Sequence, residues 1–195
     1  ETTFREFFTH LAMTSSFARN GLLYISPFNS NNQIREQKYP VTAVVRGGSA
    51  LQVSAVPVIR INTFDGDTQW QNHLESADVI IHSAARVHVM NDVESDPLAA
   101  FRKINVEGTL NLARQAAASG VRRFIFVRSI KVNGEGTKPG TAYTADDVPA
   151  PADPYGISKM EAEQGLRQLA TQTGMEVVIV RPVLVYGPGV KANFQ

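Results

Sequence analysis

Five short runs of apolar residues, many of them β-branched, recur along the chain. They are almost continuously apolar instead of alternating with polar residues, which is typical of strands buried on both faces of a parallel sheet. The runs are residues 41–45, 56–61, 79–81, 124–127 and 177–180.

Two longer segments between these runs have the composition of helices. Residues 96–119 carry recurring apolar positions and stop before Gly120, and residues 155–173 are rich in helix formers and stop before Gly174. The alternation of strands and helices predicts an α/β fold with a doubly wound parallel sheet. Because such sheets bind ligands at the carboxyl ends of their strands, we look for chemistry in the residues after each run.

Composition limits the classes of function. The chain has 19 Lys and Arg against 18 Asp and Glu, and this balance gives no electrostatic basis for binding nucleic acid. It has no cysteine, which excludes a thiol nucleophile and is compatible with the cytoplasm. No apolar run reaches membrane-helix length, no signal peptide is visible, and the histidines lack metal-ligand spacing. We therefore expect a cytoplasmic protein without a metal, nucleic-acid or membrane partner.

The strongest chemical pattern is Tyr155-Gly156-Ile157-Ser158-Lys159 at the start of a predicted helix. A spacing of four places Tyr155 and Lys159 on one helix face, where an ammonium would lower the pKa of the phenol. Taken alone, this spacing also arises by chance. Ser129 follows the run at 124–127, where its hydroxyl can bind a substrate oxygen or simply cap a turn.

Three further features support a site at the strand ends. His82-Ser83-Ala84-Ala85 follows a strand run, and its small residues either admit a ligand or allow tight helix packing. Asn105, inside a predicted helix, either braces a loop or faces solvent. Residues 133–154 are rich in Gly, Pro, Thr and Asp, and they form either a passive connection or a cover over the site.

These motifs occur in the order and spacing of one family, which the chain resembles from about residue 33 to residue 195. They are His82–Ala85, Asn105–Thr109, Ser129 with Val132-Asn133-Gly134, Tyr155–Lys159, and Arg181-Pro182 with Tyr186-Gly187-Pro188. The chain resembles the extended short-chain dehydrogenase/reductase family, in its NAD-dependent epimerase/dehydratase branch. Within that branch it looks closest to UDP-sugar 4-epimerases and 4-keto-sugar reductases.

The resemblance implies a role for each matching residue. Tyr155 would be the acid/base, Lys159 would hold the nicotinamide ribose and lower the pKa of Tyr155, and Ser129 would orient the sugar oxygen. The cofactor groove would be lined by the backbone of His82, Ala84 and Ala85. Asn105 would brace the strand end near the cofactor, and the backbone after Pro182 would face the nicotinamide. The resemblance also implies a nucleotide-sugar substrate, with Asn193 near its phosphate, and a homodimer formed through the helices at 96–119 and 155–173.

The first strand–helix turn departs from the family pattern. Counted back without gaps from residues 39–41, the three glycines of the family's cofactor loop fall on Gly21, Tyr24 and Pro27. We therefore treat residues 1–32 as a divergent segment before a Rossmann-like domain at residues 33–195. Because the match resumes abruptly near Gln33, we favour a frame-shifted or wrongly joined coding sequence over genuine divergence.

Other departures concern the cofactor and the second lobe. Arg46 stands where an acidic residue would bind a ribose hydroxyl, so NADP becomes an alternative to NAD, unless Arg46 is simply a solvated surface residue. Thr63 replaces an aspartate near the adenine, and Arg128 replaces a small residue before Ser129, where it would crowd the site. We expect most of the C-terminal substrate lobe to be absent.

Three interpretations follow from these observations. The first is an NAD(P)-dependent nucleotide-sugar epimerase or 4-keto-sugar reductase, present as a partial chain. The second is a non-catalytic Rossmann module that senses a dinucleotide or binds a protein, and the third is an inactive fragment. The combination of Ser129, Tyr155 and Lys159 favours the enzyme.

Overall fold

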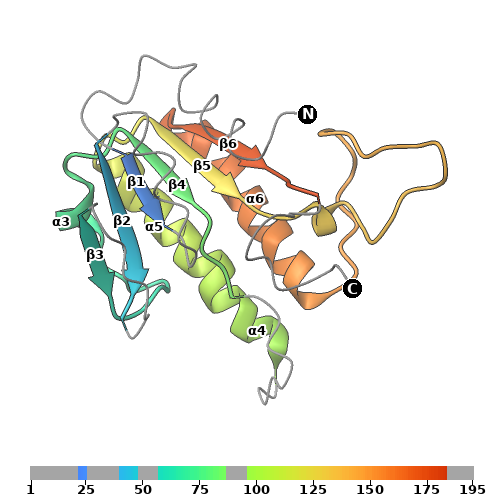
Figure 1. The fold of residues 1–195 in the computed structure, drawn as a ribbon, viewed down its shortest axis with the longest axis horizontal. Helices are drawn as coiled ribbons and strands as arrows, with labels where there is room; N and C mark the ends of the chain where they lie inside the picture. Colours follow the sequence, from blue (N-terminus) through green and yellow to red (C-terminus); the bar gives the residue numbers. More distant parts are fainter. Residues whose placement is uncertain (1–21, 26–39, 48–56, 87–95, 184–195) are drawn as a thin grey trace.

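The computed structural model describes residues 22–25, 40–47, 57–86 and 96–183. They form a six-stranded, fully parallel sheet in the order β3-β2-β1-β4-β5-β6 (Figure 1). The strands are β1 (Leu22–Ile25), β2 (Val41–Arg46), β3 (Val58–Ile61), β4 (Val79–His82), β5 (Arg123–Val127) and β6 (Glu176–Val180). The strand order reverses between β1 and β4, which is the arrangement of a doubly wound Rossmann-type sheet.

Each of the five predicted runs overlaps a strand of this sheet, and β1 adds a central strand that the sequence pattern did not predict. In β1, Leu22 pairs in register with Val41 of β2 and with Val79 of β4. Tyr24 is a strand residue, so the gap-free count that put it on a glycine of the following turn was wrong. Residues 26–39, which connect β1 to β2, contain no glycine in the sequence.

The segment predicted as one helix at residues 96–119 is divided into three parts. It consists of α4 (Pro97–Arg102), the π-helix η1 (Lys103–Gly108) and α5 (Thr109–Ala118). Asp96 caps the start, because its carboxylate accepts a hydrogen bond from the Ala99 backbone N–H at 3.0 Å. The prediction of one continuous α-helix was therefore wrong. The turn formed by η1 is wider than an α-helical turn and holds about one residue more.

Helix α6 (Pro154–Thr173) confirms the second helical prediction. The Asp153 carboxylate accepts a hydrogen bond from the Gly156 N–H at 2.6 Å and caps its start. Gly174 ends the helix with a left-handed φ of 74°, a conformation that glycine adopts without steric cost. The short helices α3 (Gln71–Leu74) and η2 (Ile130–Val132) lie in connections.

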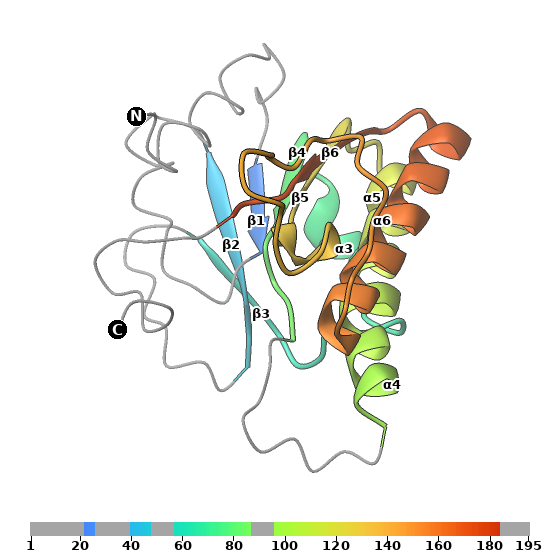
Figure 2. The ribbon, with the colours of Figure 1, turned by 90° about the vertical axis from the view of Figure 1, so that its right-hand side faces the viewer.

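Both faces of the sheet are apolar. Figure 2 shows α4, α5 and α6 together on one side of the strands, where the larger cluster buries Trp70, Phe124, Phe126, Leu112 and Leu166. The opposite face carries a second cluster of buried residues, which consists of Val41, Val79, Ile81, Ile125 and Val180. Burial on both faces explains why the strands read as continuous apolar runs.

Candidate active site

The predicted catalytic serine lies at the carboxyl ends of β5 and β6. Ser129 follows β5 and caps η2, where its hydroxyl oxygen accepts a hydrogen bond from the Lys131 N–H at 3.3 Å. The Ile130 N–H donates to the Pro182 carbonyl at 3.1 Å and joins the residues that follow the two strands. Ser129 is half-buried, so its hydroxyl lies at the edge of the sheet where such folds bind ligands.

Helix α6 brings Tyr155 and Lys159 to the same region. The Lys159 Nζ lies 5.7 Å from the centre of the Tyr155 ring and 5.3 Å from the centre of the Phe126 ring. Lys159 is fully buried, and its Nζ has no hydrogen-bond partner among the described residues. Burial, together with the nearby Arg128 charge, lowers the pKa of Lys159 to about 7.

The environment of Tyr155 corrects one expectation from the sequence. Burial raises the pKa of the phenol above its ordinary value, and the Arg128 guanidinium opposes this rise. We expected Lys159 to lower the pKa of Tyr155. Because Lys159 is itself buried, it loses part of its own charge near neutral pH and is less effective in that role.

His82 is a buried structural residue with a neutral ring. Its Nε2 lies 2.9 Å from the Thr109 hydroxyl oxygen, and its ring stacks on Phe126 with 5.4 Å between centres. Burial and the Lys159 charge lower the pKa of His82 well below its usual value. Its side chain is thus occupied by the core, so any contact with a cofactor would come from the backbone around it.

Asn105 braces the connection that follows β4. From within η1, its side-chain oxygen accepts a hydrogen bond from the Arg86 N–H at 2.9 Å, and its amide donates to the Arg86 carbonyl at 3.2 Å. The same amide donates to the Ser158 hydroxyl at 3.0 Å on α6. Asn105 is almost completely buried. The structure therefore supports the interpretation that Asn105 braces a loop, and not the alternative that it faces solvent.

The residues predicted to bind the cofactor are spread along the carboxyl edge of the sheet. Arg46 ends β2 and is exposed, while Thr63 follows β3 and accepts a hydrogen bond at its carbonyl from the Thr68 hydroxyl at 3.1 Å. Ala84 and Ala85 are half-buried in the connection after β4. Gly21 and Asn193, the remaining predicted contacts, lie outside the described residues.

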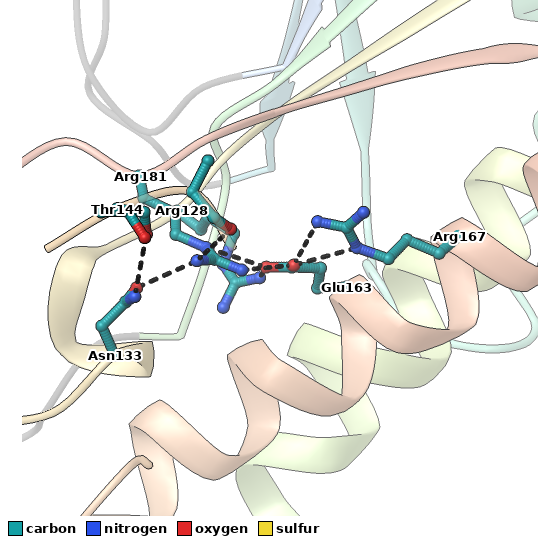
Figure 3. A network of polar contacts seen from close by, with 7 residues as sticks. Arg128, Asn133, Thr144, Glu163, Arg167 and Arg181 are labelled. Carbon is teal, nitrogen blue, oxygen red and sulfur yellow. Dashed lines mark hydrogen bonds and ion pairs between the residues drawn. The ribbon is translucent and has the colours of Figure 1, made fainter. Parts of the chain in front are cut away.

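A cluster of charges that the sequence analysis missed includes Arg128, the residue before Ser129 in the chain (Figure 3). The Glu163 carboxylate on α6 pairs with Arg128, with Arg181 at 2.6 Å and with Arg167 at 2.9 Å. The Arg128 side chain is fully buried in this contact, and its charge also acts on Tyr155 and Lys159. A usable signal was present, because Glu163 follows Lys159 by four residues, which is one more turn of the same helix face.

The long connection from Asn133 to Asp153 is tied to this cluster. Arg181 donates to the Asn133 side-chain oxygen at 3.1 Å and to the Ala145 carbonyl at 3.3 Å. The connection also borders a groove of about 690 Å³, which is lined by Arg167, Arg181, Thr144 and their neighbours. The predicted loop is therefore anchored beside the site and is not a loose surface segment.

Two other kinds of site are not found in the part of the chain that the structure describes. Across residues 22–25, 40–47, 57–86 and 96–183, no group of three or more potential metal ligands comes together. No helix in these ranges is long and apolar enough to cross a membrane.

Two bacterial relatives match more than half of the chain in sequence. A UDP-glucose 4-epimerase of Vibrio cholerae is 52% identical over 137 residues, which are 70% of this chain and 42% of that protein. A GDP-6-deoxy-D-mannose reductase of Pseudomonas aeruginosa is 33% identical over 121 residues, which are 62% of this chain and 39% of that protein. The chain therefore spans less than half the length of these relatives.

Solved structures agree with the fold. The UDP-glucose 4-epimerase of Thermus thermophilus, solved with NAD, superposes with a TM-score of 0.69 at 20% identity, over 83% of this chain and 54% of that one. The UDP-glucuronic acid 4-epimerase of Bacillus cereus, also with NAD, gives a TM-score of 0.71 at 19% identity, over 86% and 58%. The sequence model of the NAD dependent epimerase/dehydratase family matches residues 30–195, and the chain belongs to that family.

Proposed function

We propose that this chain carries the catalytic half of an NAD(P)-dependent nucleotide-sugar epimerase or 4-keto-sugar reductase. The observation that carries the proposal is the buried Lys159 ammonium beside the Tyr155 ring, at the strand edge where Ser129 lies. A buried cation without a hydrogen-bond partner among the described residues is costly unless a ligand supplies one. Two relatives in sequence are named UDP-glucose 4-epimerase and GDP-6-deoxy-D-mannose reductase, which supports a nucleotide-sugar substrate.

Tyr155 and Ser129 would act together on one oxygen of the sugar. Tyr155 accepts the proton of a sugar hydroxyl as that carbon is oxidised, and it returns the proton to the keto oxygen on reduction. Ser129 donates a hydrogen bond to the same sugar oxygen and holds it near the phenol. In an epimerase, reduction on the other face of the keto-sugar inverts the carbon, whereas in a reductase the ketone itself is the substrate.

The residues present fit the nicotinamide half of a dinucleotide. The unpartnered Lys159 Nζ can donate hydrogen bonds to ribose hydroxyls, and Asn105 fixes the backbone after β4 along the groove. When bound, the nicotinamide supplies the hydride acceptor and donor for the reaction. The connection after β1 has no glycine to bring its backbone close to a diphosphate, so we derive no contact from it. Arg46 at the end of β2 would favour NADP, whereas the NAD in the solved relatives favours NAD.

The first test is cofactor binding by the 195-residue chain. Fluorescence titrations with NADH and NADPH measure affinity for the wild type and for Lys159→Met, with Lys138→Met as the matched control in an exposed loop. We expect saturable binding that Lys159→Met weakens at least about tenfold, since it removes charged hydrogen bonds, and that Lys138→Met leaves unchanged. A folded chain that binds neither dinucleotide would contradict the proposal.

The second test is turnover. The chain is incubated with NAD(P) and UDP-glucose, or with a 4-keto nucleotide sugar and NAD(P)H, and the sugars are followed by NMR. Tyr155→Phe is expected to reduce turnover by about 10²–10⁴-fold while it preserves dinucleotide binding, because it removes only the acid/base hydroxyl. Binding without turnover in the wild type would favour the non-catalytic dinucleotide sensor instead. The homodimer stays a prediction, and light scattering that shows only monomer would contradict it.

A further inference from the structure

A fully buried hydroxyl lies between the two candidate catalytic residues of α6. Ser158 comes three positions after Tyr155 and directly before Lys159, and it is 0% exposed. Serine is an unfavourable residue inside a helix, and a buried hydroxyl is costly unless it is hydrogen-bonded. The Ser158 hydroxyl donates to the Tyr155 carbonyl at 2.8 Å and accepts a hydrogen bond from the Asn105 side-chain amide at 3.0 Å. Its burial is therefore matched by one bond within the helix and one bond to another element.

Asn105 continues this contact to the end of β4. From η1, its side chain makes two hydrogen bonds to the backbone of Arg86, at 2.9 and 3.2 Å. A continuous series of hydrogen bonds thus runs from the connection after β4, through Asn105 and Ser158, to the backbone of Tyr155. Because Asn105 lies 19 positions from Arg86 and 53 positions from Ser158, the series joins three elements that are distant in the sequence.

The other side of the same helical turn is packed against η2. A Cβ on Gly156 would lie 2.9 Å from the Pro151 side chain and 3.3 Å from the Lys131 carbonyl oxygen. Gly156 and Ser158 are two residues apart, which places them about 200° apart around the helix. The first turn of α6 is therefore held from two sides, by close packing at Gly156 and by hydrogen bonds at Ser158. Together these contacts set the rotation of the turn that carries Tyr155.

We propose that Ser158 is a positioning residue of the site, whose hydroxyl fixes the first turn of α6 against the connection after β4 and so places the Tyr155 phenol. The importance of this role for catalysis rests on the proposed function above. Ser158 acts through the backbone of Tyr155 and is assigned no contact with substrate or cofactor. A displacement of an acid/base group by about 1 Å is enough to lower a rate by up to about 10²-fold.

The experiment follows the position of Tyr155 in the chain without cofactor or substrate. All five tyrosines are replaced by 3-fluorotyrosine, and the ¹⁹F resonance of position 155 is assigned by its absence in Tyr155→Phe. This resonance is sensitive to placement, because the Phe101 ring lies edge-on to the phenol ring with 6.0 Å between centres. Each variant is compared under conditions in which the fluorescence of the buried Trp70 shows that it is folded.

The chain offers a matched control on the same helix. The Thr171 hydroxyl donates to the Arg167 carbonyl at 3.1 Å, but Thr171 is exposed. We expect Ser158→Ala and Asn105→Ala each to shift and broaden the resonance of position 155, whereas Thr171→Ala leaves it unchanged. The shift in the double variant should be well below the sum of the two single shifts, because both substitutions break the same series of hydrogen bonds.

An unchanged resonance in Ser158→Ala, an equal shift in Thr171→Ala, or additive shifts in the double variant would overturn the proposal. The comparison of Ser158→Ala with Thr171→Ala decides the question even if Asn105→Ala does not fold. In turnover assays, Ser158→Ala should lower kcat by about tenfold or more with little change in KM for the sugar. An inactive wild type would contradict the proposed function and leave the resonance result standing, whereas an unchanged resonance in an active chain would overturn only the role of Ser158.

Discussion

The buried ammonium of Lys159 provides a test of how burial and charge are linked in this fold. Its pKa is about 7 in the folded chain against an ordinary value of 10.5, so between these values the folded state binds fewer protons than the unfolded state. Stability conferred by this group therefore rises with pH from about 7 toward 10.5. At about 1.4 kcal/mol per pH unit, the penalty for burying Lys159 near pH 7 is of the order of 5 kcal/mol.

The perturbation is Lys159→Met, which shortens the side chain by one atom and removes its charge. We expect the variant to be more stable than the wild type near pH 7, with an advantage that shrinks by about 2–3 kcal/mol between pH 7.5 and 9.5. Urea unfolding at these pH values can be followed through the fluorescence of Trp70, the single tryptophan, which is completely buried. Lys138→Met, at an exposed position, should keep the pH dependence of the wild type. Parallel pH dependences in the wild type and Lys159→Met would refute the reasoning.

Three further variants test other parts of the site. Asn105→Ala should destabilise the chain by about 1–3 kcal/mol in urea unfolding, because it leaves the Arg86 N–H without its acceptor; no measurable loss would argue against the brace. Glu163→Gln should cost about 3–5 kcal/mol by leaving buried guanidinium groups without a carboxylate, and faster proteolysis between residues 133 and 153 should accompany it. Gly108→Ala should lower the melting temperature, since its Cβ would lie 2.8 Å from the Phe64 ring, whereas Gly136→Ala, with open space around it, should not.

The layout of the sheet and the candidate catalytic residues were accessible from the sequence. Strands β2 to β6 are buried on one or both faces, so each appears in the sequence as a run of apolar residues. Gly174 marks the end of α6, because glycine adopts the left-handed conformation found there. Tyr155 and Lys159 are four residues apart on a helix, and this spacing alone predicts a shared face. Local patterns of this kind are readable because they depend on neighbours in the sequence.

The charge cluster and the pKa values were not accessible in the same way. Arg128, Glu163 and Arg181 are separated by 18 or more positions along the chain, and only the packing of α6 against the ends of β5 and β6 brings them together. The lowered pKa of Lys159 depends on the depth of its burial, which no local pattern reports. The strand β1 is itself a run of four apolar residues, and it was missed because the sequence analysis set residues 1–32 apart as a divergent segment.

The π-helix η1 holds one residue more than a regular α-helix would need to join α4 to α5 in the same phase. Its wider turn takes up that residue, so Phe101 on α4 reaches Tyr155 while Asn105 within the turn reaches Arg86. Deletion of one residue from Lys103–Gly108 would give a regular α-helix whose flanking parts stay nearly in phase, but it would remove the widened turn that presents Asn105 to Arg86. Homologues that keep this brace should therefore keep the hexapeptide at its full length.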